Sequence, residues 1–208
     1  NDQNPAVIIP GLGKYHHEVS TENKKAQRFF DQGLILIYAF NHNEAIRSFE
    51  KAASLDPDLA MAYWGIAYAL GPNYNLPADN EQRKLAYRSM RKAIKHSVHA
   101  SQKEKDYINA LSKRYTKNVE KIDQYSMDRS FKEAMKELYK KYPDDPDAAT
   151  LYAESMMNLK PWQLWNKDGT PAEGTEEIIS VLESVLKKYP DHPGANHYYI
   201  HAVEASND

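Results

Sequence analysis

The sequence predicts an all-α protein built as a solenoid of stacked helical repeats, and three observations lead to this fold class. Apolar residues recur at helical spacing through nearly all of the chain after Ser20 and Thr21, which we expect to cap the first helix. Hairpin signals such as Asn-Gly or Asp-Gly are missing, and β-branched residues are sparse. A stop signal of proline beside aspartate appears three times, at residues 55–58, 142–146 and 189–193. A signal that recurs in this way indicates a repeated structural unit.

The elements follow in order along the chain. Residues 1–19 contain prolines and glycines without helical periodicity, so we expect an extended N-terminal arm there. Residues 20–208 are expected to form one helical-repeat domain. Its first helix pair turns at residues 41–43 and ends at Pro57, and a loop at residues 71–80 interrupts the second pair.

The second half of the domain continues the same pattern. Ser101 and Glu104 have the spacing of a capping box and open the third helix pair. An insertion at residues 160–174 divides the fourth pair, and a fifth begins at Ala195 with its first helix only. A repeat buries its apolar face only against its neighbours, so we expect the natural chain to continue beyond Asp208.

The spacing within the first pair identifies the kind of repeat. Residues 26–59 resemble a complete tetratricopeptide repeat, whose pattern is carried here by Phe29, Gln32, Gly33, Leu36, Ala45, Phe49 and Pro57. The resemblance implies a right-handed solenoid of about four and a half repeats with a concave groove lined by the first helix of each pair. It also implies a binding module whose groove holds a peptide, a protein partner or the protein's own arm.

Composition narrows the classes of function. The chain has 208 residues, a net charge of −2 and no cysteine, which excludes disulfides, thiolate nucleophiles and cysteine metal sites. Residues 81–141 carry 17 Lys and Arg against 8 Asp and Glu, but apolar residues at helical spacing separate them. We therefore interpret them as solvated helix faces and expect no nucleic-acid partner. The longest strongly apolar run, residues 34–40, is far shorter than the roughly 20 residues of a membrane span.

The last predicted helix carries the strongest candidate for chemistry. His197, His201 and Glu204 stand at positions i, i+4 and i+7, so all three project from one stripe of the helix. Two imidazoles one turn apart can chelate one ion, and the carboxylate can complete or orient the set. This alternative function is that of a transition-metal-binding protein, a metal-dependent sensor or an enzyme, with copper or zinc as the expected ion. Binding should weaken below a pH of about 6.5, because neutral imidazoles are needed.

Two other groups of residues are linked to this predicted site. His201 occupies the position that the repeat pattern normally gives to leucine, as do Gln32, Ile66 and Glu154 earlier in the chain. Glu154 is expected to form an ion pair with His201, to bind the ion itself, or to accept a hydrogen bond that fixes the His201 tautomer, and Asn196 is also expected to support the ligands by hydrogen bonding. The arm is long enough to bring His16 or His17 to the last helix as a further ligand.

Aromatic and amide residues form the candidate groove surface, for which the alternative interpretation is ordinary helix packing. If exposed, they would hold a peptide or shape a small-molecule pocket; they are Trp64, Tyr68, Asn73, Asn75, Tyr152, Trp162 and Trp165. No complete acid–base or nucleophile arrangement accompanies them, so an enzyme is not the leading expectation.

The chain also resembles a particular group of bacterial tetratricopeptide-repeat proteins. The segments that carry this resemblance are residues 11–17, 29–34, 40–42, 62–65, 70–75, 161–165 and 192–204. Members of the group are often exported, so the resemblance implies an exported or periplasmic location, and it implies no particular reaction.

Overall fold

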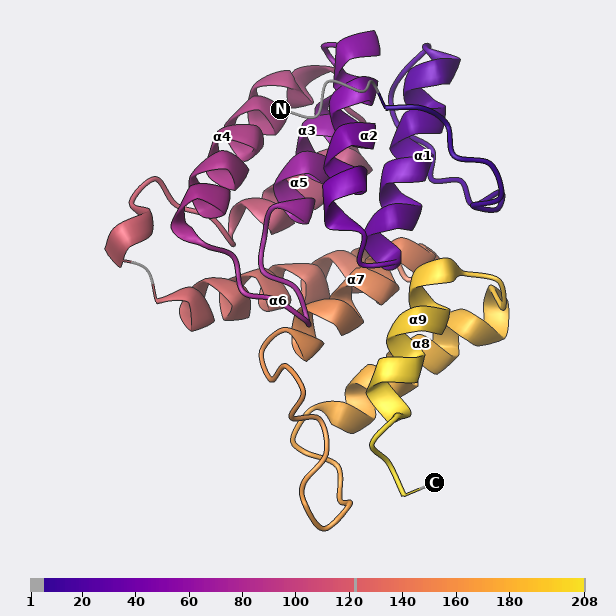
Figure 1. The fold of residues 1–208 in the computed structure, drawn as a ribbon, viewed down its shortest axis with the longest axis vertical. Helices are drawn as coiled ribbons and strands as arrows, with labels where there is room; N and C mark the ends of the chain where they lie inside the picture. The colour runs from indigo at the N-terminus through magenta and orange to yellow at the C-terminus, as the bar shows by residue number, and fades with distance from the viewer. Residues whose placement is uncertain (1–5, 122, 208) are drawn as a thin grey trace. The chain divides into compact units, whose positions relative to one another are not determined.

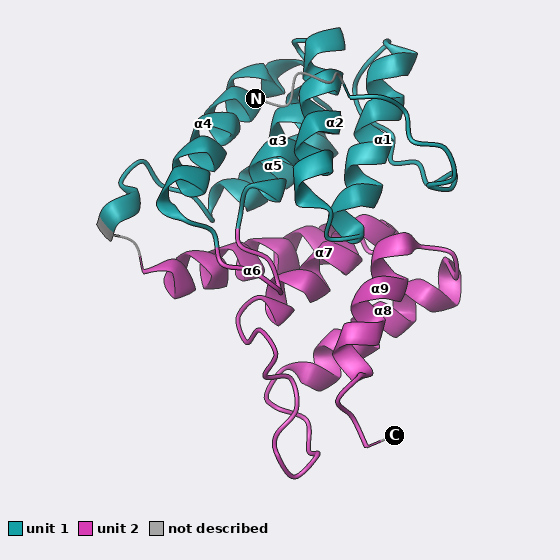
Figure 2. Ribbon diagram, in the orientation of Figure 1, with its two compact units in different colours: residues 1–71, 78–121 teal, residues 72–77, 122–208 magenta. Residues whose placement is uncertain are grey.

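The computed structural model describes residues 6–121 and 123–207, and this part of the chain contains nine α-helices and no β-strand (Figure 1). The prediction of an all-α protein is therefore confirmed. The described residues divide into two compact units (Figure 2). Unit 1 comprises residues 6–71 and 78–121, and unit 2 comprises residues 72–77 and 123–207.

Unit 1 contains the arm and five α-helices in which each helix packs on the next along the chain. The contacts also reach the next helix but one, since α1 touches α3 and α3 touches α5. The helices are α1 (Lys24–Tyr38), α2 (His42–Leu55), α3 (Ala60–Ala69), α4 (Asn80–His96) and α5 (Gln102–Ser112), with short 3-10 turns η1 (Ser97–His99) and η2 (Val119–Lys121).

The packing of α2 between α1 and α3 depends on one aromatic ring. Phe49 of α2 is fully buried, and a Cβ atom at Gly33 or Gly65 would lie 2.7 or 2.5 Å from its ring. Only glycine on α1 and α3 therefore lets the three helices approach this closely.

The start of α1 differs from the expected cap. Asn23 is the N-cap, and its Oδ1 accepts from the backbone N–H groups of Lys25 and Ala26. The hydroxyls of Ser20 and Thr21 instead donate to the carboxylates of Glu104 and Asp56. They are short side chains next to acidic groups of α5 and the end of α2, so they fasten the start of α1 to those elements.

Unit 2 contains α6 (Gln124–Lys141), α7 (Pro146–Met157), α8 (Thr175–Lys188) and α9 (Pro193–Val203). Each packs on the next, and α7 also contacts α9. The two predicted insertions are non-helical, as expected, apart from the first residue of α4 at position 80. The second insertion contains an isolated bridge between Trp165 and Pro171, which is too short to form a strand.

The N-terminus of α9 is fixed on α7 by a buried histidine. His192 Nδ1 accepts from the backbone N–H of Ala195 at 3.0 Å, and its Nε2 lies 3.3 Å from Asp147 Oδ1. Pro193 follows at the first helical position, where its missing N–H costs nothing. This capping sets where the histidines further along α9 point.

Within the described residues, none of the helices combines the length and the apolar character needed to cross a bilayer.

Candidate functional site

His197 and His201, called the histidine pair below, face each other along one side of α9. Their Nε2 atoms are 3.1 Å apart, and their ring centroids are 4.8 Å apart. Both residues are partly exposed. The helical spacing that placed them on one stripe therefore also makes their outer nitrogens converge on one point.

Glu204 lies on the other side of the His201 ring. Its Oε1 is 2.9 Å from His201 Nδ1. A carboxylate can only accept a hydrogen bond, so this contact assigns the ring proton of His201 to Nδ1 and leaves the lone pair on Nε2. Since His201 Nε2 then accepts, His197 Nε2 donates in the contact between the two rings. In this structure Glu204 orients His201 through the nitrogen that does not face His197.

Two aromatic residues from distant parts of the chain contact the His201 ring of the histidine pair. Tyr74 comes from residues 72–77, and its ring centroid lies 5.6 Å from that of His201. Trp162 lies edge-on to His201 at 5.9 Å and 5.0 Å from Tyr74. Trp162 has a left-handed backbone with φ of 60° and is 60% exposed, whereas Tyr74 is 3% exposed.

The environment of Tyr74 ties it to the same site. Burial raises the pKa of its hydroxyl, the backbone N–H of Trp162 works against that rise, and the charge of Glu204 adds to it. The loop that presents Tyr74 is held by Asn73, whose Oδ1 accepts from the backbone N–H groups of Asn75 and Leu76. The amide that we expected to face a groove therefore shapes the loop.

Glu154 and Asn196, which were expected to support the histidine ligands, have other hydrogen-bond partners in this structure. Glu154 is 2% exposed and accepts a hydrogen bond of 2.6 Å from Asn158. The pKa of the Tyr198 hydroxyl is raised, mainly because Tyr198 is buried and in addition because of the negative charge of Glu154. Asn196 lies in the first turn of α9 and donates to the carbonyl groups of Pro190 and His192, which joins the start of the helix to the turn before it.

Several predicted groove residues pack inside their units. Trp64 and Tyr68 are 2% and 3% exposed and lie against each other in unit 1, where the Trp64 ring also meets Tyr107. The expectation that Trp64 and Tyr68 line an open binding surface is therefore wrong. Their helix, α3, is apolar on all sides and is buried by its contacts with α1, α2, α4 and α5.

Two aromatic residues of unit 2, Tyr152 and Trp165, also make hydrogen bonds within their unit. Tyr152 is buried, and its hydroxyl donates to Glu177 at 2.8 Å. Burial and this carboxylate raise its pKa well above the usual range for tyrosine. Trp165 donates from Nε1 to the carbonyl oxygen of Ala202, which connects the second insertion to α9.

A second candidate site lies where the arm runs beside α1 (Figure 1). Gln32 donates from Nε2 to the carbonyl of Val7 at 2.9 Å and accepts from the N–H of Ile9 at 2.8 Å. Gln27 repeats this arrangement with the carbonyl of His17 at 2.9 Å and the N–H of Val19 at 3.1 Å. We call each such pair of hydrogen bonds an amide clamp.

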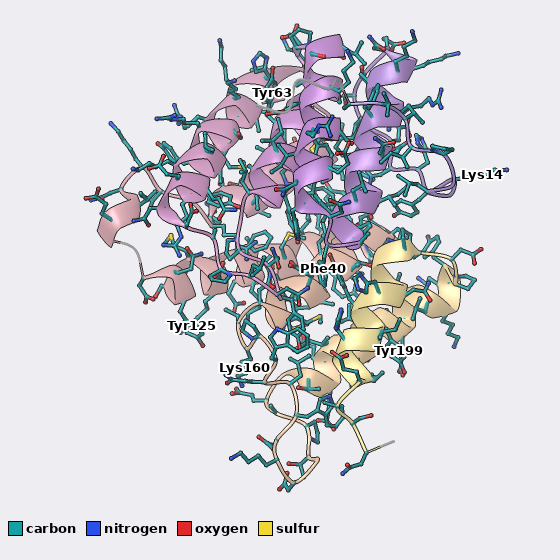
Figure 3. The ribbon with its side chains drawn as sticks, in the orientation of Figure 1. Lys14, Phe40, Tyr63, Tyr125, Lys160 and Tyr199 are labelled. Carbon is teal, nitrogen blue, oxygen red and sulfur yellow. The ribbon has the colours of Figure 1, made fainter. Side chains whose placement is uncertain are left out.

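The arm bends away from α1 between the two clamps. Gln27 and Gln32 are about 7.5 Å apart along the helix axis, whereas eight extended residues would span about 26 Å. Gly11 and Gly13, with φ of 87° and 90°, allow the bend, and Lys14 on it points outward (Figure 3). A cavity of about 220 Å³ remains between the bend and α1, with Arg28 and Asp31 in its wall.

The arm histidines make their described contacts in unit 1. His16 Nδ1 lies 2.8 Å from Asp31 Oδ2, and the backbone N–H of His17 donates to the other oxygen of Asp31. The buried His17 ring contacts Phe30 and Tyr107. That either histidine serves the site on α9, which belongs to unit 2, stays a prediction.

Gln27, Asp31 and Tyr74 were not among the functional residues that the sequence pattern predicts. Gln27 and Asp31 were visible as polar residues on a largely apolar helix, a pattern that indicates a polar partner. For Tyr74 the sequence offered no comparable pattern, apart from its position in the loop at residues 71–80.

Comparisons with known proteins do not assign either site: no protein-family model matches the chain, and no curated protein or solved structure matches it.

Proposed function

We propose that the protein is a tetratricopeptide-like helical-repeat binding protein that holds an extended peptide along α1. The observation that carries this proposal is the pair of amide clamps on the arm. In this structure the segment held along α1 is the protein's own arm.

The clamps recognise backbone in an extended conformation. In a β-like segment the carbonyl of one residue and the N–H of the second residue after it point to the same side. A glutamine side chain has one carbonyl and one NH₂ group, so a single amide satisfies both backbone groups. Gln32 does this for residues 7 and 9, and Gln27 does it for residues 17 and 19.

At the first clamp the side chains of the arm are exposed or only partly buried. Val7 is 62% exposed, and Ile8 and Ile9 are only partly buried. The hydrogen bonds are worth about 1 kcal/mol each in net terms, so the first clamp holds the arm only modestly. A peptide with other side chains can therefore compete for the same place on α1, while His16 and its carboxylate partner add selectivity near the second clamp.

The test uses a labelled peptide with the sequence of residues 6–19 and the full chain. The attached arm competes at a high effective concentration, so the wild-type chain should bind the free peptide weakly. Ile9→Pro removes the N–H that Gln32 accepts and so loosens the attached arm while α1 stays intact. Fluorescence anisotropy should show tighter peptide binding by Ile9→Pro than by the wild type.

Matched variants connect the binding to the clamps. Adding Gln27→Ala and Gln32→Ala to the Ile9→Pro chain should abolish binding, whereas adding Gln102→Ala, an exposed glutamine of α5, should not. Equal binding by all of these chains, or binding by none, would contradict the proposal.

A further inference from the structure

We infer that the histidine pair on α9 is a binding site for one divalent first-row transition ion, Zn²⁺ or Cu²⁺, with Glu204 as the positioning residue. The site is independent of the peptide proposed to bind α1, because different residues on a different helix form it.

The separation of the two Nε2 atoms fits a shared ion. Two imidazole nitrogens bound to one ion at about 2.0–2.1 Å are about 3.3 Å apart at a tetrahedral angle and about 2.9 Å apart at a right angle. The observed separation of 3.1 Å lies between these values. A linear arrangement, by contrast, would need about 4 Å. The pair therefore suits a tetrahedral or tetragonal ion.

The contact with Glu204 prepares His201 as a ligand. A metal-bound histidine commonly donates its other ring N–H to a carboxylate, which fixes the tautomer and makes the ligating nitrogen more basic. Here the Nδ1–H of His201 donates to Glu204 at 2.9 Å, and the Nε2 lone pair points towards His197. His197 becomes the second ligand when its proton moves from Nε2 to Nδ1, a change of tautomer without a change of charge.

The donor set indicates the class of ion. Two neutral imidazoles without a thiolate suit Zn²⁺ and Cu²⁺, whereas Mg²⁺ and Ca²⁺ prefer oxygen ligands. Two histidines leave other coordination positions for water or a small anionic ligand. Tyr74 and Trp162 lie against the His201 ring, so they limit the space on that side.

The first experiment is calorimetric titration of the untagged full chain with ZnCl₂ and with CuCl₂. We expect one ion per chain, and we expect His197→Ala or His201→Ala to weaken binding by about 100-fold or more, because one imidazole cannot chelate. His99→Ala, which removes an exposed histidine of unit 1, is the matched control and should bind like the wild type. Circular dichroism establishes that each variant is folded.

Spectroscopy provides a test that does not depend on affinity. Electron paramagnetic resonance of the Cu²⁺-loaded chain should show coupling to two imidazole nitrogens, and to one fewer in either alanine variant. Cu²⁺ should also quench the fluorescence of Trp162, and Trp162→Phe should lose that part of the quenching. Equal affinity in the wild type and both alanine variants, or no binding at millimolar metal, would overturn the site.

The role of Glu204 is tested separately. Glu204→Gln should weaken binding by about 10–100-fold while the stoichiometry stays at one. In the metal-free chain, ¹⁵N chemical shifts should show the His201 proton on Nδ1 in the wild type and a mixture of tautomers in Glu204→Gln. Unchanged shifts and unchanged affinity would remove Glu204 from the site.

Discussion

Gln32 on α1 and His201 on α9 occupy the same position of the predicted repeat pattern, which normally has leucine there, yet the two side chains have different kinds of partner. Gln32 is 4% exposed and bonds to the arm and to Ser48 of α2. His201 bonds within its own helix, to His197 and Glu204. At the same position Ile66 is simply buried among apolar residues.

The difference between the two residues shows what a polar side chain needs at a position where an apolar one is expected. A buried polar group left without a partner costs about 1–3 kcal/mol, so each such residue requires a specific neighbour. In α1 the neighbour is a separate segment of chain, which binds through its backbone. In α9 the neighbours are one turn away, which brings two ring nitrogens together. The first arrangement suits a peptide, and the second suits an ion.

The largest expected effect comes from removing the Phe49 ring, which packs against Gly33, the neighbour of Gln32 in the sequence. Phe49→Ala removes the ring that α1 and α3 share and should destabilise the chain by about 3–5 kcal/mol. Hydrogen exchange should show the loss of protection concentrated in α1–α3 and the arm. An equal loss of protection in α7–α9 would contradict the description of unit 1 as a compact body of its own.

A third histidine sharpens the contrast with the pair on α9. Burial and the positive charge of Arg114 lower the pKa of His42 to about 4 from its usual 6.5, and neither ring nitrogen has a hydrogen-bond partner in the described part of the chain. Below pH 6.5 the unfolded chain takes up a proton that the folded chain accepts only near pH 4. Stability should therefore fall as pH is lowered through this window, by up to about 3 kcal/mol.

Denaturant titrations at pH 7 and at pH 4.5 measure this dependence on His42. His42→Leu should reduce the difference in unfolding free energy between the two pH values, while other groups contribute equally to both chains. The same pH dependence in wild type and variant would show that His42 titrates normally.

Gln32→Leu introduces the residue that the predicted repeat pattern normally has at this position and should have an intermediate effect. It removes three hydrogen bonds but buries an apolar side chain, so we expect a loss of about 1–2 kcal/mol. The amide of Ile9 should exchange much faster, and that of Val19, held by Gln27, should change little. Equal acceleration at both amides would indicate that the clamps do not act separately.

His201→Leu is the matching change on α9 and should have the smallest effect on stability. The lost hydrogen bonds, to His197 and Glu204, are local and partly exposed, and leucine keeps an apolar side chain beside Tyr74 and Trp162, so we expect a change within about 1 kcal/mol in the metal-free chain. Stabilisation by added ZnCl₂, seen as a rise in Tm for the wild type, should be absent. A Tm rise equal to that of the wild type would place the ion elsewhere.

The amino-acid sequence by itself determined the features that depend on local geometry. Helical periodicity, the Ser101–Glu104 capping box and the two insertions were all predicted, because each reflects residues within a few turns of one another. For the same reason the alignment of His197, His201 and Glu204 on one stripe could be predicted from their spacing alone.

Only the tertiary structure decided which distant segments meet. The arm lies on Gln27 and Gln32, Tyr74 lies against His201, and Trp64 is buried where an open surface was expected. Glu154 bonds to Asn158, while Glu204 takes the position on His201 Nδ1. Helical spacing states which face a residue occupies but not what covers that face, because the covering residues are brought there by packing between segments far apart in the chain.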